Sequence, residues 1–600
     1  MKPPFRWLPV VVWVYFALCF TLHPSSLILQ GNFIDSDDYL KLVQAIDWLK
    51  GQGWFDPIQH RMNPPAGVFV HFSSLFNLLY GIPIFLLQPW FGYVGAATIT
   101  AAFFPLLYFA LFLMAVRWAA LPFVGKDWAW VTAYIALFSG AVLSQFNPGR
   151  VDHHGVELLI AITAMGASIR MMQRSDGWKW AIAAGSFLAL GVSIGLEFLP
   201  VFFIASGWLG LWMIITGMKA RRSGHIFSLA LFVPALVLLY ISRGPQHFFD
   251  IQAAAYSFVY IVLIGLVALW FLCIGWASIL PVKRRVVCGG GAIFIAAAVF
   301  LFYFPNLIGG PYGVINPKLE AMILGYATEA WPLMRQDASA QALLFPIIAI
   351  VVQFRFFQNA DQRHRWVTGF LFALITTTTL LAVFYQQRFI AYAQAFSIIP
   401  LTLLLKNIWA AINVWRPRSR RLVMRAAAVL MMPLIAVVIP VLTGGRPLLA
   451  DIVFFPVSHK GTECPLNFAS RSLSESYGSK SQTIMNTIGE GAELLFRTPH
   501  KVLAGPYHMN LEGNLDSYKF FSTYNPDIAR AIVRRRNVDF VVMCRSTNYF
   551  GDEPKPADNA LNFSQQLSSG KIPPWLRQIG IPGNVMLFEV KPRNRKSRHD

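Results

Sequence analysis

Charged side chains are scarce in this chain, and their scarcity excludes an ordinary soluble protein. Only 13% of its 600 residues are Asp, Glu, Lys or Arg, whereas 56% are hydrophobic. The mean hydropathy of +0.51 is typical of proteins with many membrane helices. The composition therefore predicts a chain that crosses a membrane repeatedly.

We also expect no cleavable signal peptide. The apolar run from about Trp7 to Leu29 is too long for a signal-peptide core and carries no Ala-x-Ala cleavage site. Cys19 follows Leu18 rather than a small residue, which argues against lipoprotein processing. The run predicts a retained first membrane helix whose N-terminus lies in the cytoplasm.

Apolar runs of this kind recur as far as residue 443, without an internal repeat. Each is close to the ~20 residues that a helix needs to cross a bilayer, and together they predict about thirteen membrane helices. The runs lie at about 7–29, 94–116, 128–146, 155–172, 180–196, 198–217, 226–241, 257–279, 287–304, 341–357, 366–385, 389–405 and 427–443.

Basic residues cluster between these runs, and the clusters follow the even-numbered helices. The positive-inside rule assigns that side to the cytoplasm. The clusters include Arg117, Lys126, Arg170, Arg174, Lys179, Lys219, Arg221, Arg222, Lys283, Arg284, Arg285, Arg355, Arg363, Arg365, Lys406 and Arg425. Membrane orientation thus accounts for the net charge of +21, and nucleic acid is not an expected partner. An odd helix count places the C-terminus outside.

Beyond residue 443 the chain becomes polar, and its pattern changes. Short β-type runs at 501–505, 538–543 and 585–590 surround a helical pattern at 528–534. We expect a polytopic α-helical membrane protein with a C-terminal periplasmic α/β domain, in a bacterial inner membrane. The predicted divisions are a membrane domain at 1–443, with outer loops at 31–93 and 305–340, and the α/β domain at 444–600.

Five cysteines occur in the chain. Cys19, Cys273 and Cys288 lie in apolar runs and are expected only to pack. Cys464 and Cys544 lie in the predicted periplasmic domain, where an oxidising compartment permits a disulfide, and we predict that they form one.

Three carboxylates gather early in the first outer loop, at Asp35, Asp37 and Asp38. They repel one another unless a cation or a basic group is near, which favours a binding site. An alternative is the capped N-terminus of a helix, because an amphipathic pattern follows and Asp favours first-turn positions. The two interpretations are compatible, since a capped helix can present one Asp to a metal.

A second polar stretch runs from Arg150 to Glu157, between two apolar runs. Asp152 and His154 place an oxygen and a nitrogen ligand close together, as a metal site requires. The alternative is a solvated loop in which Asp152 caps the next helix. This stretch taken alone does not decide between them.

Two further polar groups fall on the same outer face. Glu329 lies between the ninth and tenth predicted helices, where an ordinary solvated loop acid is the alternative. Arg388 lies at the outer turn before the twelfth. It is suited either to anchor the helix at the lipid interface or to hold a phosphate.

With these motifs the chain resembles the catalytic subunit of oligosaccharyltransferases, in the GT-C class of membrane glycosyltransferases. The family's motifs are matched, in chain order, by Asp37-Asp38-Tyr39, Asp152-His153-His154, Ala327-Thr328-Glu329 with Trp331-Pro332, and Arg388-Phe389. The family also resembles this chain in its thirteen membrane helices and C-terminal outer domain.

The resemblance implies transfer of a sugar from a polyprenyl-phosphate-linked donor, at the outer face of the bilayer. It implies that Asp37, Asp152, His154 and Glu329 hold a divalent cation, with catalytic roles for the three acids. This ligand set suits Mg²⁺ or Mn²⁺. Arg388 is expected to bind the donor phosphate. The remaining residues assigned to the substrate side are Arg150, Asp35 and Asp38.

The family's peptide-reading motif, Trp-Trp-Asp-Tyr-Gly, is missing, and Trp575 is the only tryptophan beyond residue 445. The acceptor is therefore left open as a protein, a lipid or an envelope glycan. Two rival functions are a transporter or flippase of lipid-linked glycans and a non-catalytic scaffold. A transporter is expected to place polar residues at the membrane midplane of broken helices, often with an internal repeat.

Overall fold

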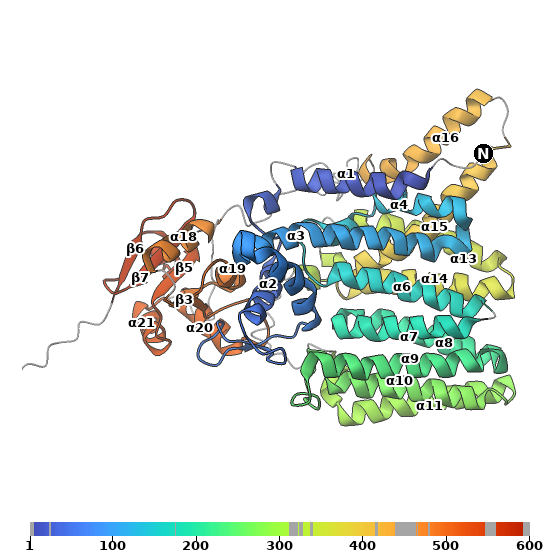
Figure 1. The fold of residues 1–600 in the computed structure, drawn as a ribbon, viewed down its shortest axis with the longest axis horizontal. Helices are drawn as coiled ribbons and strands as arrows, with labels where there is room; N and C mark the ends of the chain where they lie inside the picture. The colour runs from blue at the N-terminus through green and yellow to red at the C-terminus, as the bar shows by residue number, and fades with distance from the viewer. Residues whose placement is uncertain are drawn as a thin grey trace, which may run out of the picture.

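In the computed structural model, a bundle of long helices carries a smaller α/β unit at one end (Figure 1). The structure describes residues 5–22, 26–174, 176–310, 322, 328–335, 340–414, 418–438, 464, 466–477, 480–545 and 560–591. Ala327 and the boundary predicted at 443/444 lie outside them, as does most of the predicted outer loop 305–340.

Ten segments within the described ranges are long and apolar enough to cross a membrane. The long helices of the bundle are α1 (Leu8–Leu22), α3 (Leu75–Trp128), α6 (His154–Gln173), α7 (Gly177–Ile194), α8 (Leu199–Thr216), α9 (Met218–Arg243), α10 (Phe258–Ala277), α11 (Val282–Tyr303), α14 (Gln362–Phe384) and α15 (Phe389–Ile412). The prediction of a multi-pass helical membrane protein is thereby confirmed.

The difference from about thirteen spans has three sources. The run predicted at 341–357 forms α13 (Leu344–Asn359), which is 16 residues long. The run at 427–443 begins in α16 (Arg418–Pro433) and extends beyond the described residues.

The third source is the run at 128–146, which is broken into short helices. These are η3 (Ala129–Val131), α4 (Thr132–Ala136), α5 (Gly140–Leu143) and η4 (Ser144–Phe146). At the break, the backbone N–H of Ala141 donates to Gln394 Oε1 at 2.9 Å. A side chain from another helix thus satisfies a donor that an unbroken helix would satisfy internally.

The first outer loop contains a helix, α2 (Ser36–Leu49), and a short hairpin of β1 (Ile58–Gln59) and β2 (Val68–Phe69). Asp35 caps α2 by accepting a hydrogen bond from the Asp37 N–H at 2.8 Å. Asp38 completes a capping box by accepting from the Asp35 N–H at 3.1 Å. The capped-helix interpretation of this acidic stretch is correct, and the cap fixes the directions of the three carboxylates.

The C-terminal α/β unit, residues 466–591, is built on a five-stranded sheet of order β4-β3-β5-β7-β6. Its elements are α18 (Leu466–Tyr477), β3 (Thr483–Asn486), α19 (Gly491–Arg497), β4 (Lys501–Val502), α20 (Leu511–Ser522), α21 (Pro526–Arg535), β5 (Phe540–Cys544), α22 (Phe563–Ser568), β6 (Leu576–Ile579) and β7 (Val585–Val590). Strand β3 is parallel to β4 and β5, whereas β7 is antiparallel to β5 and β6. The central strand β5 is buried along its whole length, so both faces of the sheet are covered.

This unit is joined to the first outer loop by backbone hydrogen bonds. The Val502 N–H donates to the Arg61 carbonyl, and the Asn63 N–H donates to the Val502 carbonyl, both at 2.8 Å. Residues 61–63 therefore extend the sheet at the edge of β4. The Tyr507 hydroxyl donates to the carbonyl of Ser36, at the start of α2, at 3.0 Å. These bonds hold the acidic end of α2 against the α/β unit.

Orientation in a bilayer remains a prediction. In Figure 1 the α/β unit lies at one end of the bundle, and α1 begins at the opposite end. An N-terminus in the cytoplasm and a C-terminal unit outside require this arrangement.

The predicted disulfide between Cys464 and Cys544 is present, with the two Cα atoms 5.8 Å apart. It joins the chain just before α18 to the end of β5, across a sequence separation of 80. Closing a loop of this size lowers the conformational entropy of the unfolded chain. In the chain-entropy model this stabilises the folded state by about 4 to 5 kcal/mol.

Replacing both cysteines with serine is expected to lower the free energy of unfolding of the α/β unit by about 2 to 4 kcal/mol. Thermal unfolding of the full-length protein measures the loss, and Cys273→Ser, at an exposed position in α10, serves as the control. Mass spectrometry of non-reduced peptides should first show the Cys464–Cys544 cross-link in the parent. Two free thiols in freshly extracted protein would contradict the bridge.

Candidate active site

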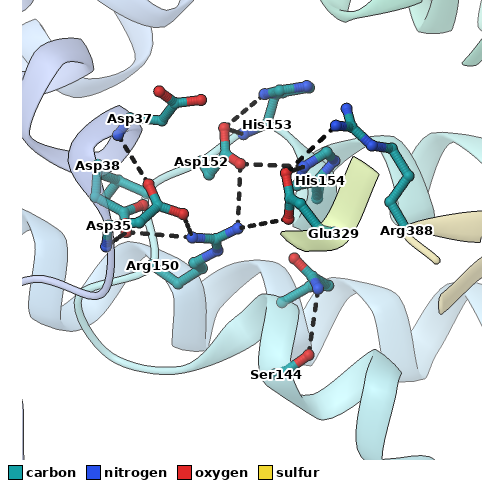
Figure 2. Close-up of polar contacts among 12 residues, drawn as sticks. Asp35, Asp37, Asp38, Ser144, Arg150, Asp152, His153, His154, Glu329 and Arg388 are labelled. Carbon is teal, nitrogen blue, oxygen red and sulfur yellow. Dashed lines mark hydrogen bonds and ion pairs between the residues drawn. The ribbon is translucent and has the colours of Figure 1, made fainter. Parts of the chain in front are cut away.

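Four stretches that lie far apart in the sequence meet at the end of the bundle that carries the α/β unit (Figure 2). The start of α2 supplies Asp35, Asp37 and Asp38. The segment before α6 supplies Arg150 and Asp152, and His154 begins that helix. Glu329 comes from η7 (Thr328–Ala330), and Arg388 immediately precedes α15. The structure thus brings together all the residues singled out from the sequence as site residues.

Arg150 is the counter-ion at the centre of this cluster. Its side chain is only 7% exposed and pairs with Asp35, and it lies 3.5 Å from Asp38 Oδ2. It also lies 3.3 Å from Asp152 Oδ2 and 4.0 Å from Glu329 Oε2. One guanidinium therefore balances carboxylates from three of the four stretches. Its predicted place on the substrate side remains a prediction.

Asp152 divides its two oxygens between different neighbours. Oδ1 pairs with Lys41 Nζ and accepts from the His153 N–H at 2.7 Å. Oδ2 lies 3.3 Å from both Arg150 and His154 Nε2. Burial alone would raise the pKa of Asp152, but its cationic neighbours, His153 first and then Lys41, hold that pKa well below its usual range. Asp152 is therefore ionised at neutral pH.

The spacing around Asp152 suits a divalent cation. Asp152 Oδ2 lies 3.3 Å from His154 Nε2, which lies 3.9 Å from Glu329 Oε1. Ligand atoms at about 2.1 Å from an ion are roughly 3.0 to 3.5 Å from one another. The ligand atoms of Asp152, His153 and His154 also lie within 4.8 Å of one another. These residues fit a metal with oxygen and nitrogen ligands after small side-chain movements.

Asp37 lies beside this group. In Figure 2 its carboxylate lies near the labelled side chains of Asp152 and His153, and all three interact electrostatically. Burial and the charge of Asp35 raise the pKa of Asp37 to about 7, although Lys41 opposes them. An acid held so close to other carboxylates gains from a nearby cation, as the metal-ligand role predicted for it requires.

Glu329 and Arg388 are docked together through both backbone and side chains. The Arg388 N–H donates to the Glu329 carbonyl at 3.2 Å, and the Gln387 N–H donates to the Trp331 carbonyl at 2.8 Å. Arg388 Nη2 lies 3.6 Å from Glu329 Oε1. The side chain of Glu329 is 42% exposed, whereas those of His154 and Asp152 are 10% and 2% exposed. Glu329 therefore has more access to solvent than these two predicted cation ligands, and it lies beside the predicted phosphate-binding residue Arg388.

Four ionisable residues of the site were not predicted from the sequence as site residues: Lys41, His153, Glu157 and Glu197. His153 Nε2 lies 3.0 Å from Glu197 Oε2, and the other oxygen of Glu197 pairs with Arg388. Glu197 therefore links the metal-ligand stretch to the arginine. A signal for it exists in the sequence, because a lone acid between two apolar runs is expensive in a membrane and points to function.

The described residues of the site carry more carboxylates than basic groups. The paired carboxylates are Asp35, Asp38, Asp152, Glu157, Glu197 and Glu329, with Asp37 beside them, and the Lys and Arg side chains that pair with them are Lys41, Arg150 and Arg388. Burial and the charge of Asp35 raise the pKa of Asp37 to about 7 and also raise the pKa of Asp38. A divalent cation beside these two acids would favour their ionised forms.

The α/β unit also reaches the site through aromatic contacts. The ring of Tyr507 packs edge-on against Phe72, and Phe72 lies 6.2 Å from the ring of His153. His508 lies 5.0 Å from His71, the residue before Phe72. Tyr507 and His508 of the C-terminal unit thus contact Phe72 and His71, and Phe72 in turn lies near His153 of the site.

No family model and no curated protein matches the chain. Among solved structures, the fold is similar to that of the archaeal oligosaccharyltransferase AglB from Archaeoglobus fulgidus, solved with an inhibitory peptide and a dolichol-phosphate. The TM-score is 0.67 at 16% identity, over 90% of this chain and 69% of the other. The A. fulgidus enzyme solved with Zn and sulfate matches with a TM-score of 0.65 at 16% identity, over 90% and 68% of the chains.

A looser likeness, with a TM-score of 0.40 at 11% identity, extends over 97% of this chain and 97% of ArnT from Cupriavidus metallidurans bound to undecaprenyl phosphate. The fit to the archaeal enzyme shows that this chain has the fold of a GT-C membrane glycosyltransferase. The resemblance expected from the four short motifs is confirmed at the level of the fold.

Proposed function

We propose that the protein is a metal-dependent glycosyltransferase that moves a sugar or oligosaccharide from a polyprenyl-phosphate-linked donor to a periplasmic acceptor. The observation that carries the proposal is the placement of Asp152, His154 and Glu329 beside Arg388, at one end of a GT-C bundle. The dolichol-phosphate in the archaeal neighbour, and the Zn in another structure of that enzyme, support a lipid-linked donor and a divalent ion.

For this reaction the protein has to position the donor and the acceptor and to neutralise the charge of the departing phosphate. The bond from the anomeric carbon to the phosphate oxygen breaks, and its electron pair leaves with the phosphate. A new bond forms to an oxygen or nitrogen of the acceptor, which releases a proton. When bound, the metal would neutralise charge on the departing phosphate. Asp37, Asp152, His154 and Glu329 would hold it, and the ligand set favours Mn²⁺ or Mg²⁺.

Arg388 would contact the donor phosphate. Its guanidinium pairs with Glu197 and lies near Glu329, so the plane of the group is already oriented. The fork of N–H donors at the edge of that plane suits a pair of phosphate oxygens. Because the ionised groups gather at one end of the bundle, the proposal favours a transferase at the bilayer surface over a transporter. The α/β unit would be periplasmic and the bundle would lie in a bacterial inner membrane, with the domains dividing near residue 444. The acceptor would be a protein, a lipid or an envelope glycan.

The test is sugar transfer by purified protein in lipid nanodiscs, with Mn²⁺ and a polyprenyl-phosphate-linked sugar. Arg388→Ala is expected to raise the KM for the donor by about 10- to 100-fold, because a charge-assisted hydrogen bond to phosphate is lost. Arg335→Ala, an exposed arginine of η8 (Leu333–Arg335), should leave KM unchanged. Mass spectrometry of the products identifies the acceptor.

Two results would count against the proposal. One is a parent protein that consumes no polyprenyl-linked sugar with any acceptor class. The other is an Arg388→Ala variant that folds and keeps the parent's KM, which would remove the arginine from the donor site.

A further inference from the structure

We propose that Lys41 is a built-in cation of the site that weakens binding of the divalent metal, so that the metal is held firmly only with the donor's phosphate present. This inference rests on the proposed function for the identity of the donor. Its own measurement is metal affinity, which does not require turnover.

Lys41 is buried inside the cluster. It lies one helical turn after Asp37 on α2, and its side chain is 0% exposed. Its ammonium group pairs with Asp152 Oδ1 and lies 3.1 Å from His153 Nδ1. The same group lies 3.9 Å from the centre of the Phe72 ring. The charge therefore has a carboxylate on one side and an aromatic face on the other.

Burying an ammonium group here is costly for stability. Charged groups lose their hydration on burial, and a buried ion pair seldom stabilises more than apolar residues of the same size. Phe72 and Phe76 flank Lys41 and would pack equally well against an apolar side chain. The positive charge is thus better explained by its effect on Asp152 than by packing.

The effect on a metal follows from the way Asp152 is shared. Lys41 pairs with Oδ1, whereas Oδ2 lies 3.3 Å from both Arg150 and His154 Nε2, on the side of the candidate cation site. A metal on Oδ2 and the ammonium on Oδ1 would then share one carboxylate. Two cations this close repel, and repulsion grows with the double charge of the metal and with exclusion of water. Lys41 therefore lowers the affinity of Asp152 for a divalent ion.

An anionic donor changes this balance. A phosphate bound at Arg388 would add negative charge next to Glu329, which lies 3.6 Å from Arg388. The metal then gains an attraction that offsets the ammonium. Metal and donor should consequently bind with positive coupling, and the coupling should depend on the charge at position 41.

The test is Mn²⁺ titration by calorimetry on full-length protein in nanodiscs, with and without undecaprenyl phosphate. Lys41→Gln keeps a polar side chain and removes the charge, and Lys41→Arg keeps the charge. A unit charge at this distance changes the proton affinity of a carboxylate by about 10- to 1,000-fold. Since a metal ion and a proton are both cations that bind the carboxylate, removing the charge of Lys41 in Lys41→Gln should tighten Mn²⁺ binding by at least about tenfold. Lys50→Gln, at the exposed end of the same helix, should stay within about threefold of the parent.

Undecaprenyl phosphate should tighten Mn²⁺ binding more in the parent and Lys41→Arg than in Lys41→Gln. Equal or weaker Mn²⁺ binding by a folded Lys41→Gln variant would overturn the inference and make Lys41 a positioning residue for Asp152. If the parent transfers no sugar but Lys41→Gln binds Mn²⁺ more tightly than the parent does, the proposed function is overturned and the inference about Lys41 is supported. No Mn²⁺ binding in parent or variant would overturn both.

Discussion

Asp152→Asn is expected to lose bound divalent cation and at least about 100-fold of the rate of sugar transfer. The amide keeps the shape of the carboxylate but removes its negative charge. That carboxylate faces His154 and forms ion pairs with both Lys41 and Arg150. Metal content by mass spectrometry and turnover in nanodiscs are measured on the same preparation. The two losses should occur together.

Asp250→Asn is the matched control, because Asp250 lies in the loop between α9 and α10 and pairs with His247 of the same loop at 2.8 Å. It should keep the parent's metal content and rate. Full turnover by Asp152→Asn, or by the parent in excess chelator, would end the metal mechanism.

Arg150→Met should destabilise the protein more than any other single change in the site, by about 3 to 5 kcal/mol. Removing one partner of a buried ion pair leaves the other charges without compensation. Here Asp35, Asp38 and Asp152 all lose the same guanidinium. Thermal unfolding of purified protein in nanodiscs measures the loss.

Arg150→Lys provides the comparison, because it retains the charge but not the planar fork that reaches several acids at once. It should recover about half of the lost stability, as expected for a retained charge with poorer hydrogen bonds. An Arg150→Met variant that unfolds at the parent's temperature would show that the carboxylates do not depend on this counter-ion.

The sequence predicted the fold well where local chemistry decides the structure. Apolar runs near the length of a membrane span became helices, because backbone groups in lipid must bond within their own segment. Asp35 followed by an amphipathic pattern became a capped helix for an equally local reason. The run at 128–146 was wrongly predicted to form one continuous helix. The break in it is stabilised by a hydrogen bond from the Ala141 N–H to Gln394, which lies on another helix and cannot be recognised from the local sequence.

The site was predicted only in part for the same physical reason. Asp152 and His154 stood out because two ligand types two residues apart form a recognisable pattern. Lys41 did not, because its significance depends on Asp152, which lies 111 residues away. Glu197 is a recognisable lone acid between apolar runs, but its partner Arg388 lies 191 residues away and cannot be found from the local pattern. Topology placed the four polar stretches on one face, but only tertiary packing shows which charge neutralises which.

The hydrogen bonds that join residues 61–63 to the edge of β4 have a consequence for how such a protein can be re-engineered or can evolve. The α/β unit cannot be exchanged as an independent cassette, because one strand edge of its sheet belongs to the loop that positions Asp37 and Lys41. A graft of a different α/β unit must also bring a matching partner for that edge. It must also replace the bond from the Tyr507 hydroxyl to the Ser36 carbonyl, or the first turn of α2 loses a contact that holds it in place.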